Sequence, residues 1–213
     1  MRMVMPEKRE TGLHPQDFML RNLLLTLLTF SIAIGGGAAS VWYALDADDG
    51  FDPLHVGAWT AFPALGTANA SPYAKAVAAR DGVLALGHAE GIRFVANGDS
   101  TGKPLSRGCT YTVAGDTPPA RFWTLFPADP HSLMPLRAKE GLPGKLQSWA
   151  VLRRAKGSFA VTVGPHAAPG NWLAIDGSGP MALTLTLYDT PAATSSEIGS
   201  IELPKIKRAG CDG

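Results

Sequence analysis

The sequence predicts a mainly β protein: an antiparallel β-sandwich or jelly-roll-like domain with one or two short helices, preceded by one transmembrane helix. Three observations predict this class. The segment from Leu23 to Tyr43 carries no charged side chain and is long enough to cross a bilayer as a helix. After residue 90, several segments alternate apolar and polar residues with the two-residue period of a strand. The chain has 24 glycines and 17 prolines but only 17% charged residues, which favours short strands joined by turns.

The apolar segment also predicts which side of the membrane each end of the chain occupies. Four basic residues precede it, namely Arg2, Lys8, Arg9 and Arg21, and the next one is Lys75. Because basic flanks stay in the cytoplasm, we expect a cytoplasmic N-terminus and a periplasmic C-terminal domain at a bacterial inner membrane. A cleaved signal peptide is the alternative, since residues 38–40 (AAS) are similar to a cleavage site, although the apolar segment exceeds a usual signal core.

Composition divides the chain into four parts. We expect a cytoplasmic tail at residues 1–22, a transmembrane helix at 23–44, a periplasmic linker at 45–70 and a periplasmic β-rich domain at 71–213. Small residues four positions apart in the helix, such as Gly36 and Ser40, permit close helix packing and hence a homo-oligomer formed through the helix. A helix end that is merely rich in glycine and alanine explains the same residues.

Within the outer domain, one helix and then six or seven short strands are expected. Ser71 is a suitable N-cap and Pro72 fits the first helical position, which predicts a helix at 71–80. The predicted strands span residues 91–97, 109–115, 121–126, 148–153, 158–163, 181–188 and 198–203. The first two are expected to pair as a hairpin, and so are the fourth and fifth. In the strand at 181–188, alternation with threonine puts Leu183, Leu185 and Leu187 on the buried face.

Cysteine usage and net charge restrict the classes of function. Cys109 and Cys211 are the two cysteines of the chain, and in an oxidising compartment they are expected to form a disulfide; two separate buried thiols are the alternative. The net charge of +1 without a basic run gives no support for nucleic-acid binding. The five histidines have no ligand-like spacing, so no metal or other cofactor is predicted.

Aromatic residues next to polar groups are the candidate binding elements. Trp172 lies where a glycine-containing loop becomes a strand, and aromatic rings on strands either fill a core or stack on a flat ligand such as a sugar. The residues predicted to bind a ligand are Arg121, Trp123, Asn171, Trp172 and Tyr188. If the stretches 118–123 and 169–172 approach one another, Arg121, Asn171 and Trp172 line a shared concave surface.

Several of these segments, taken in order, resemble a known bacterial family. They are SPYAKAVAARDGVLALGHAEGIRF, CTYTVAGDTPPARFWTLF, GSFAVTVGP, PGNWLAI and LTLTLYDTP. This succession resembles the family catalogued as domain of unknown function 1214, over roughly residues 57–211, in a stand-alone, membrane-anchored form. The resemblance implies a β-rich fold. It implies no established reaction and supplies no catalytic residues.

These observations favour a non-catalytic interaction or ligand-binding module, anchored in the inner membrane and exposed to the periplasm. Its expected partners are the membrane and an envelope protein or a glycan or lipid ligand. One alternative is an accessory subunit of a larger inner-membrane complex. The other is an envelope hydrolase acting on lipid, glycan or peptide, for which the candidate acid and base groups are Glu90, Asp99, His166 and Asp189.

Overall fold

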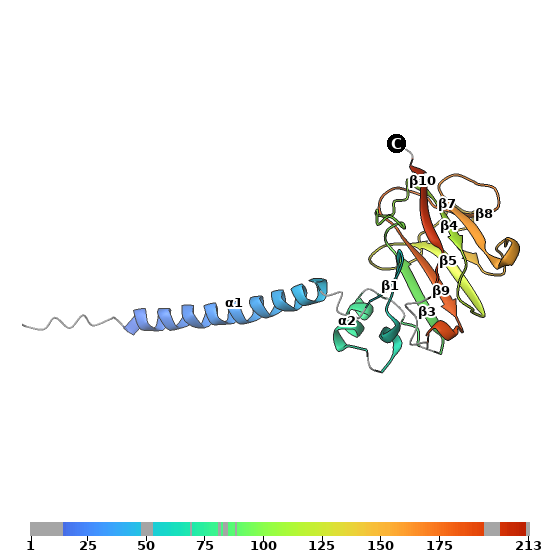
Figure 1. The fold of residues 1–213 in the computed structure, drawn as a ribbon. Helices are drawn as coiled ribbons and strands as arrows, with labels where there is room; N and C mark the ends of the chain where they lie inside the picture. The colour runs from blue at the N-terminus through green and yellow to red at the C-terminus, as the bar shows by residue number, and fades with distance from the viewer. Residues whose placement is uncertain are drawn as a thin grey trace, which may run out of the picture. The chain divides into compact units, whose positions relative to one another are not determined.

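The computed structural model describes residues 15–47, 53–68, 70–80, 82, 85–87, 89–193 and 201–211. The chain divides into two compact units, residues 1–48 and residues 49–213. We call the second unit the β domain and describe the two units separately (Figure 1).

The first unit contains one long helix, α1 (Pro15–Ala47). By length and composition its segment Phe18–Tyr43 can cross a membrane, and none of that segment is buried in the structure. The transmembrane helix expected at residues 23–44 lies within α1. The first three basic residues used to predict the orientation, at positions 2, 8 and 9, lie outside the described residues.

The larger sheet of the β domain has six strands, and every neighbouring pair is antiparallel. In spatial order they are β1 (Leu54–Val56), β2 (Trp59–Ala61), β3 (Gly91–Ala96), β9 (Ala182–Tyr188), β5 (Phe122–Ala128) and β6 (Leu146–Gln147). Strand β9 pairs with β3 on one side and with β5 on the other. Its leucines at 183, 185 and 187 are buried, as the alternation predicted.

The smaller sheet has four strands. In spatial order they are β10 (Lys205–Cys211), β4 (Cys109–Gly115), β7 (Phe159–Gly164) and β8 (Asn171–Ala174). The pairs β10–β4 and β4–β7 are antiparallel, whereas β7 and β8 are parallel. The predicted class, a mainly β domain of two sheets with few helices, is confirmed, with this parallel pair as an addition that the sequence pattern did not indicate.

The core lies between the two sheets, whose inward side chains interdigitate as in other sandwiches. Its largest fully buried side chains include Trp59, Phe94, Tyr111, Trp123 and Phe159. Trp123 on the larger sheet stacks on Phe159 of the smaller one, with ring centroids 4.7 Å apart. Trp59 is anchored because its indole N–H donates to the carbonyl of Pro204 over 2.7 Å.

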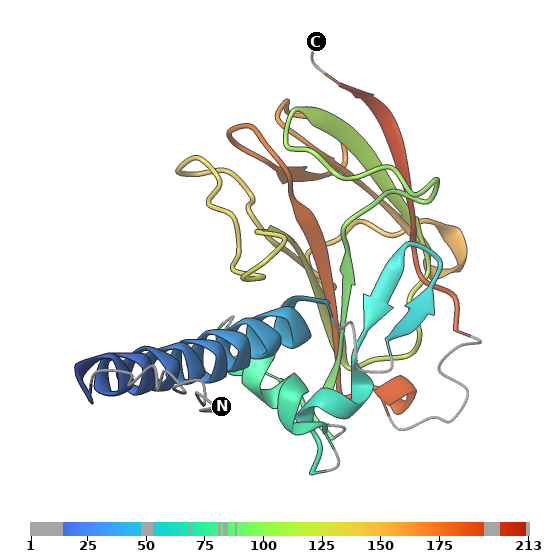
Figure 2. The ribbon, with the colours of Figure 1, turned by 90° about the vertical axis from the view of Figure 1, so that its left-hand side faces the viewer.

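Helices contribute little to the β domain. The expected helix at 71–80 is present as α2 (Pro72–Arg80). Single 3₁₀ turns occur at η1 (Pro63–Gly66), η2 (Ala155–Gly157) and η3 (Pro191–Ala193). Figure 2 shows the long connection between β5 and β6 (yellow) projecting from one side of the domain.

Several predicted strand pairings and limits were wrong. Strands β3 and β4 do not form a hairpin but lie in different sheets, because residues 97–108 cross from one sheet to the other. Residues 148–153 form turns rather than a strand, apart from one bridge between Arg153 and Phe159. The stretch expected as a linker includes β1 and β2, which complete one edge of the larger sheet. The last strand follows residue 203 instead of ending there; residues 194–200 lie outside the described part.

The C-terminal strand β10 is held by contacts that are distant in sequence. The sulfur atoms of Cys109 and Cys211 lie 2.04 Å apart, at disulfide distance, across a directly paired position of β4 and β10. Asp99, 3% exposed, accepts hydrogen bonds from Thr101 and from the N–H of Lys103. Its other carboxylate oxygen lies 3.3 Å from Nε of Arg208 on β10. The hydrogen bond from the Thr101 side chain is the main cause that lowers the pKa of Asp99.

Candidate functional site

The side of the larger sheet that faces away from the core carries an unusual combination of side chains. Alternation along β3, β5 and β9 turns Arg93, Val95, Thr124, Phe126 and Tyr188 to this side, together with Thr184 and Thr186. We call these seven residues the outer face. Thr186 pairs with Arg93 on β3 and with Thr124 on β5. One row across these three strands therefore consists of a guanidinium followed by two hydroxyl groups.

Arg93 is the electrostatic centre of this face. Its side chain is partly buried, its Nε is fully buried, and no hydrogen bond or ion pair of the guanidinium is found within the described part of the chain. Burial lowers the pKa of Arg93, and the nearby hydroxyl of Tyr188 opposes that shift. A desolvated cation without a partner costs free energy. The fold therefore tolerates an uncompensated positive charge here.

A turn between β5 and β6 covers part of the outer face. Thr184 and Thr186 are at most 1% exposed although they point away from the core, and Oγ1 of Thr184 has no hydrogen-bond partner. Leu133 lines a hollow together with Arg93 and Val95, and Leu136 lines a groove together with Thr124 and Phe126, which puts the turn at 129–136 on this side of the sheet. Asp129 fixes this turn by accepting hydrogen bonds from the N–H groups of His131 and Ser132. These backbone hydrogen bonds lower the pKa of the Asp129 carboxyl.

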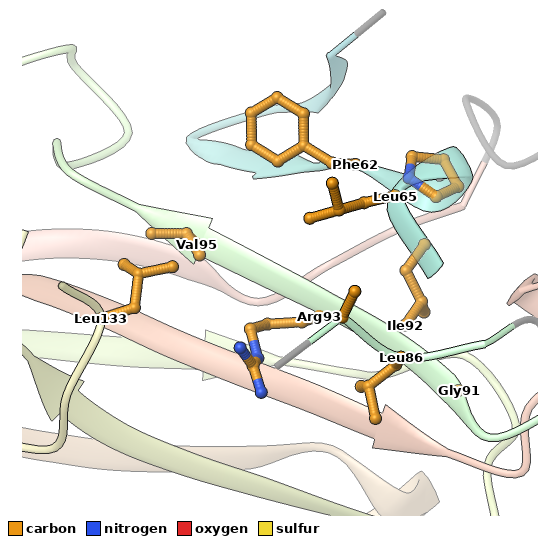
Figure 3. A pocket seen from close by; sticks show the side chains of 10 residues that line it. Phe62, Leu65, Leu86, Gly91, Ile92, Arg93, Val95 and Leu133 are labelled. Carbon is orange, nitrogen blue, oxygen red and sulfur yellow. The ribbon is translucent and has the colours of Figure 1, made fainter. Parts of the chain in front are cut away.

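A small hollow lies beside β3 (Figure 3). Its volume is about 50 Å³ and its walls are mostly apolar: Phe62, Leu65, Leu86, Ile92, Val95 and Leu133. Arg93 is the charged residue among its lining side chains, and Figure 3 shows the guanidinium directed from β3 toward the neighbouring strand β9. The hollow is large enough for a small head group and too small for a whole organic ligand.

A wider groove lies beside β5 on the same face. It measures about 520 Å³, and its floor is made by Thr124 and Phe126. Its walls are Tyr188 and the connection between β5 and β6, which supplies Leu136, Leu142 and Lys145 among others. An open apolar groove with a few polar groups at its rim is the usual form of a small-molecule site.

The hollow and the groove each have a lining residue in one row of the sheet. Gly91 lines the hollow, Tyr188 lines the groove, and the two residues are direct partners across β3 and β9. A Cβ atom at Gly91 would lie 2.0 Å from the carbonyl oxygen of Leu187, so the position requires glycine. Because it has no side chain, Gly91 adds no wall between the two depressions.

Tyr188 also belongs to an aromatic cluster at the edge of the groove. Its ring stacks on Phe122, with centroids 4.5 Å apart. The ring of Phe122 in turn contacts the edge of Trp149 at 5.6 Å, and Trp149 is 70% exposed. Of the predicted binding residues, Tyr188 lines one of the two depressions described above.

Trp123 and Arg121, both predicted to bind a ligand, lie in different environments. Trp123 is 2% exposed and belongs to the core, so its ring is not available to a ligand. The reason is alternation along β5, which turns Phe122 outward and Trp123 inward. Arg121 forms an exposed ion pair with Asp189, whose atoms lie 2.7 Å apart.

Asn171 and Trp172 are used largely for local structure. The Asn171 amide accepts from the N–H of Leu152 and donates to the carbonyls of Leu152 and Ala160. The Trp172 ring is half-buried, and its N–H donates to the carbonyl of Gly164 over 3.2 Å. No hydrogen bond or ion pair joins Arg121 to either residue in the described part of the chain, so the shared surface expected for them is not formed by such contacts.

The carboxylates proposed for a hydrolase have different side-chain partners, although the backbones of Glu90 and Asp189 are hydrogen-bonded to each other. Asp99 is engaged with Thr101 and Arg208, Glu90 accepts from the N–H of Gly87, and Asp189 pairs with Arg121. His166 is exposed on the connection after β7. Over the described ranges, no group of three or more His, Cys, Asp or Glu residues could hold a metal ion.

Sequence reasoning missed Arg93, the most informative residue of the site. The signal was present, because the predicted strand at 91–97 puts Ile92 and Phe94 on the buried side and leaves a charged residue at mid-strand on the other. Its significance depends on the neighbours that the sheet order brings to it. That order was not deducible from the local pattern.

Comparisons with known proteins agree with the fold. Residues 90–192 match the model of a family described as "Protein of unknown function (DUF1214)", which confirms the family resemblance over most of the β domain's strands. The crystal structure of the VPA0106 protein from Vibrio parahaemolyticus is similar with a TM-score of 0.56 and 15% identity, covering 95% of this chain and 48% of that one.

A second crystal structure, of a putative uncharacterized protein from Burkholderia cenocepacia, has a TM-score of 0.38 and 14% identity, covering 57% of this chain and 29% of that one. The chain thus spans about half the length of the Vibrio protein (48%) and less of the second. A search of curated proteins finds no match. At this identity the likeness to the Vibrio structure shows the fold alone.

Proposed function

We propose that this chain, whose residues 90–192 match the DUF1214 family, is a non-catalytic, membrane-tethered module that binds a small, largely apolar ligand on the outer face of its larger sheet. In this proposal α1 anchors the protein in a bacterial inner membrane, with residues 1–22 in the cytoplasm and the β domain in the periplasm. The observation that carries the proposal is the partly buried Arg93, which has no hydrogen-bond or ion-pair partner among the described residues and lines an apolar hollow on the same face as a wider groove.

Two features favour binding over catalysis. The depressions are lined by apolar and aromatic side chains with few polar groups, which suits recognition of an apolar body. The carboxylates considered for acid–base chemistry are each engaged in a structural contact of their own. A proton-transfer mechanism needs at least one such group beside the reacting atoms.

A binding experiment on the full chain in lipid nanodiscs tests the proposal. Octanol and octanoate serve as soluble eight-carbon probes, and saturation-transfer NMR measures their Kd, with empty nanodiscs as the reference. The variant Thr124→Phe fills the groove, and Thr162→Phe places the same ring on β7 of the smaller sheet as a matched control. We expect Thr124→Phe to weaken at least one probe tenfold and Thr162→Phe to leave both within twofold.

Failure of both probes to bind, or equal effects of the two variants, would contradict a site in the groove. Ala138→Phe, which enters the groove from its other wall, repeats the test if Thr124→Phe does not fold. Near-UV circular dichroism establishes that each variant is folded. Protease added to spheroplasts tests the orientation, since it should digest the β domain; protection of that domain would contradict a periplasmic location.

A second candidate role, as an accessory subunit of a membrane complex, is favoured by one observation. Trp149 and Leu152 are 70% and 69% exposed on the turns after β6. Exposed apolar residues of this size near each other are typical of contact surfaces. Under this alternative, cross-linking from position 152 captures one defined membrane protein, whereas the ligand-binding role predicts no such adduct.

A further inference from the structure

The structure restricts the chemical class of the ligand through the charge of its head group and the length of its chain. We propose that the outer face recognises an amphipathic carboxylate, whose head group pairs with Arg93 in the hollow and whose apolar chain passes over Gly91 and Tyr188 into the groove. This inference rests on the proposed function and adds the chemical class of the ligand.

The charge of the head group follows from Arg93. The guanidinium has no partner in the described part of the chain, and the hollow that it lines is otherwise mostly apolar. A carboxylate supplies the opposite charge in a planar shape that accepts two parallel hydrogen bonds from a guanidinium. One cation in the hollow matches a single negative charge, and about 50 Å³ matches a group of carboxylate size.

The length of the ligand follows from the strand order. Arg93 on β3 and Thr124 on β5 are the partners of the same residue, Thr186 on β9. They are therefore two strand spacings apart, or about 10 Å. The route over Gly91 and Tyr188 is at least this long, so the ligand needs an extended chain of at least about eight carbons, for which the groove of about 520 Å³ has room.

The path between the two depressions is set by Gly91 and Tyr188. Gly91 lines the hollow and its partner Tyr188 lines the groove, whereas Leu133 and Leu136 of the turn at 129–136 line the hollow and the groove, respectively. The Tyr188 ring is supported from behind by Phe122. A rigid aromatic wall at this point would contact the apolar chain at little entropic cost.

The test compares three eight-carbon probes that differ in head-group charge: octanoate, octanol and octylammonium. Each is titrated into the full chain in nanodiscs, with empty nanodiscs subtracted. For the wild-type chain we expect octanoate to bind at least tenfold more tightly than octanol, and octylammonium to bind most weakly.

Substitution of Arg93 should remove this order. In Arg93→Gln we expect octanoate to lose at least tenfold in affinity while octanol changes less than threefold; Arg93→Lys should restore part of the loss because it keeps the charge but not the planar fork. Arg107→Gln, a cation outside the face, is the matched control and should leave the order intact.

The outcomes separate the two proposals. If the wild type binds octanoate and octanol with equal affinity, and Thr124→Phe weakens both, the carboxylate assignment is overturned. The ligand-binding function is then still supported. Absence of binding by every probe would overturn the function itself. A charge preference that survives in Arg93→Gln would show that another cation, such as Lys145 at the groove, recognises the head group, and would refute the role given to Arg93.

Discussion

Replacement of Arg93 by methionine should make the protein more stable. Methionine keeps an unbranched apolar stem of similar length, so the packing of the stem in the hollow is largely retained. The substitution removes a guanidinium whose Nε is buried without a hydrogen-bond partner. A binding role for Arg93 predicts that the chain retains this residue although it lowers the free energy of unfolding.

The size of the effect follows from the environment of the side chain. A buried polar group without a compensating hydrogen bond costs about 1–3 kcal/mol in protein mutational data. Because Arg93 is only partly buried, we expect Arg93→Met to raise the free energy of unfolding by about 1 kcal/mol. For a domain of this size, that corresponds to an increase of about 2–4 °C in Tm.

The assay is thermal unfolding of the full chain in nanodiscs, followed by the near-UV circular dichroism of the tryptophans of the β domain. Arg121→Met is the matched control, because its exposed ion pair with Asp189 contributes at most about 1 kcal/mol. It should leave Tm unchanged or lower it slightly. With octanoate at about 100 times its Kd, the wild type should gain about 2.7 kcal/mol and the methionine variant much less.

A decrease of 1 kcal/mol or more in Arg93→Met would refute the reasoning. It would mean that the guanidinium makes favourable contacts in the native state that outweigh its desolvation. In that case Arg93 would be a structural residue, and its charge would not indicate an anion in the hollow.

Three further predictions concern the framework of the β domain. Cys211→Ser should lower the free energy of unfolding by about 4–5 kcal/mol, since the bond closes a loop with a sequence separation of 102; a denaturant titration that gives the wild-type midpoint would show that the cysteines are not bonded. Asn171→Ala should cost about 1–3 kcal/mol through the loss of three hydrogen bonds, with octanoate affinity retained; loss of binding without loss of stability would return Asn171 to the site. The pKa of Asp99 is lowered in the folded state, so its carboxylate stabilises the fold above its ordinary pKa of about 3.9, and this contribution decreases below that value and is lost as the pH falls through the lower pKa of the folded state; the stability difference between wild type and Asp99→Asn should therefore be larger at pH 6 than at pH 3.5, and a constant difference would contradict the assignment.

Local sequence patterns were sufficient for several elements of this protein. The uncharged segment at 23–43 predicted the helix that can cross a membrane, because a bilayer imposes both length and apolarity on one continuous stretch. The alternation of leucine and threonine in 181–188 predicted β9 and its buried face, since successive side chains of a strand point to opposite sides. The two cysteines were sufficient to suggest their pairing, whose sulfurs lie at bonding distance.

Tertiary structure decided which faces meet and therefore where a site can form. Strands β3 and β4 have the local features of a hairpin, yet they belong to different sheets. Strand β9 enters between β3 and β5 from a position distant in sequence, and this alone brings Tyr188 beside Gly91 and Thr186 beside Arg93. Trp123 and Trp172 have equally suggestive contexts in the sequence, but one is in the core and the other is half-buried on the smaller sheet. The physical reason is that alternation along the sequence fixes only which residues share a face of a strand. Which of the two faces is covered depends on long-range strand pairing and on the turn at 129–136. Local periodicity encodes neither of them.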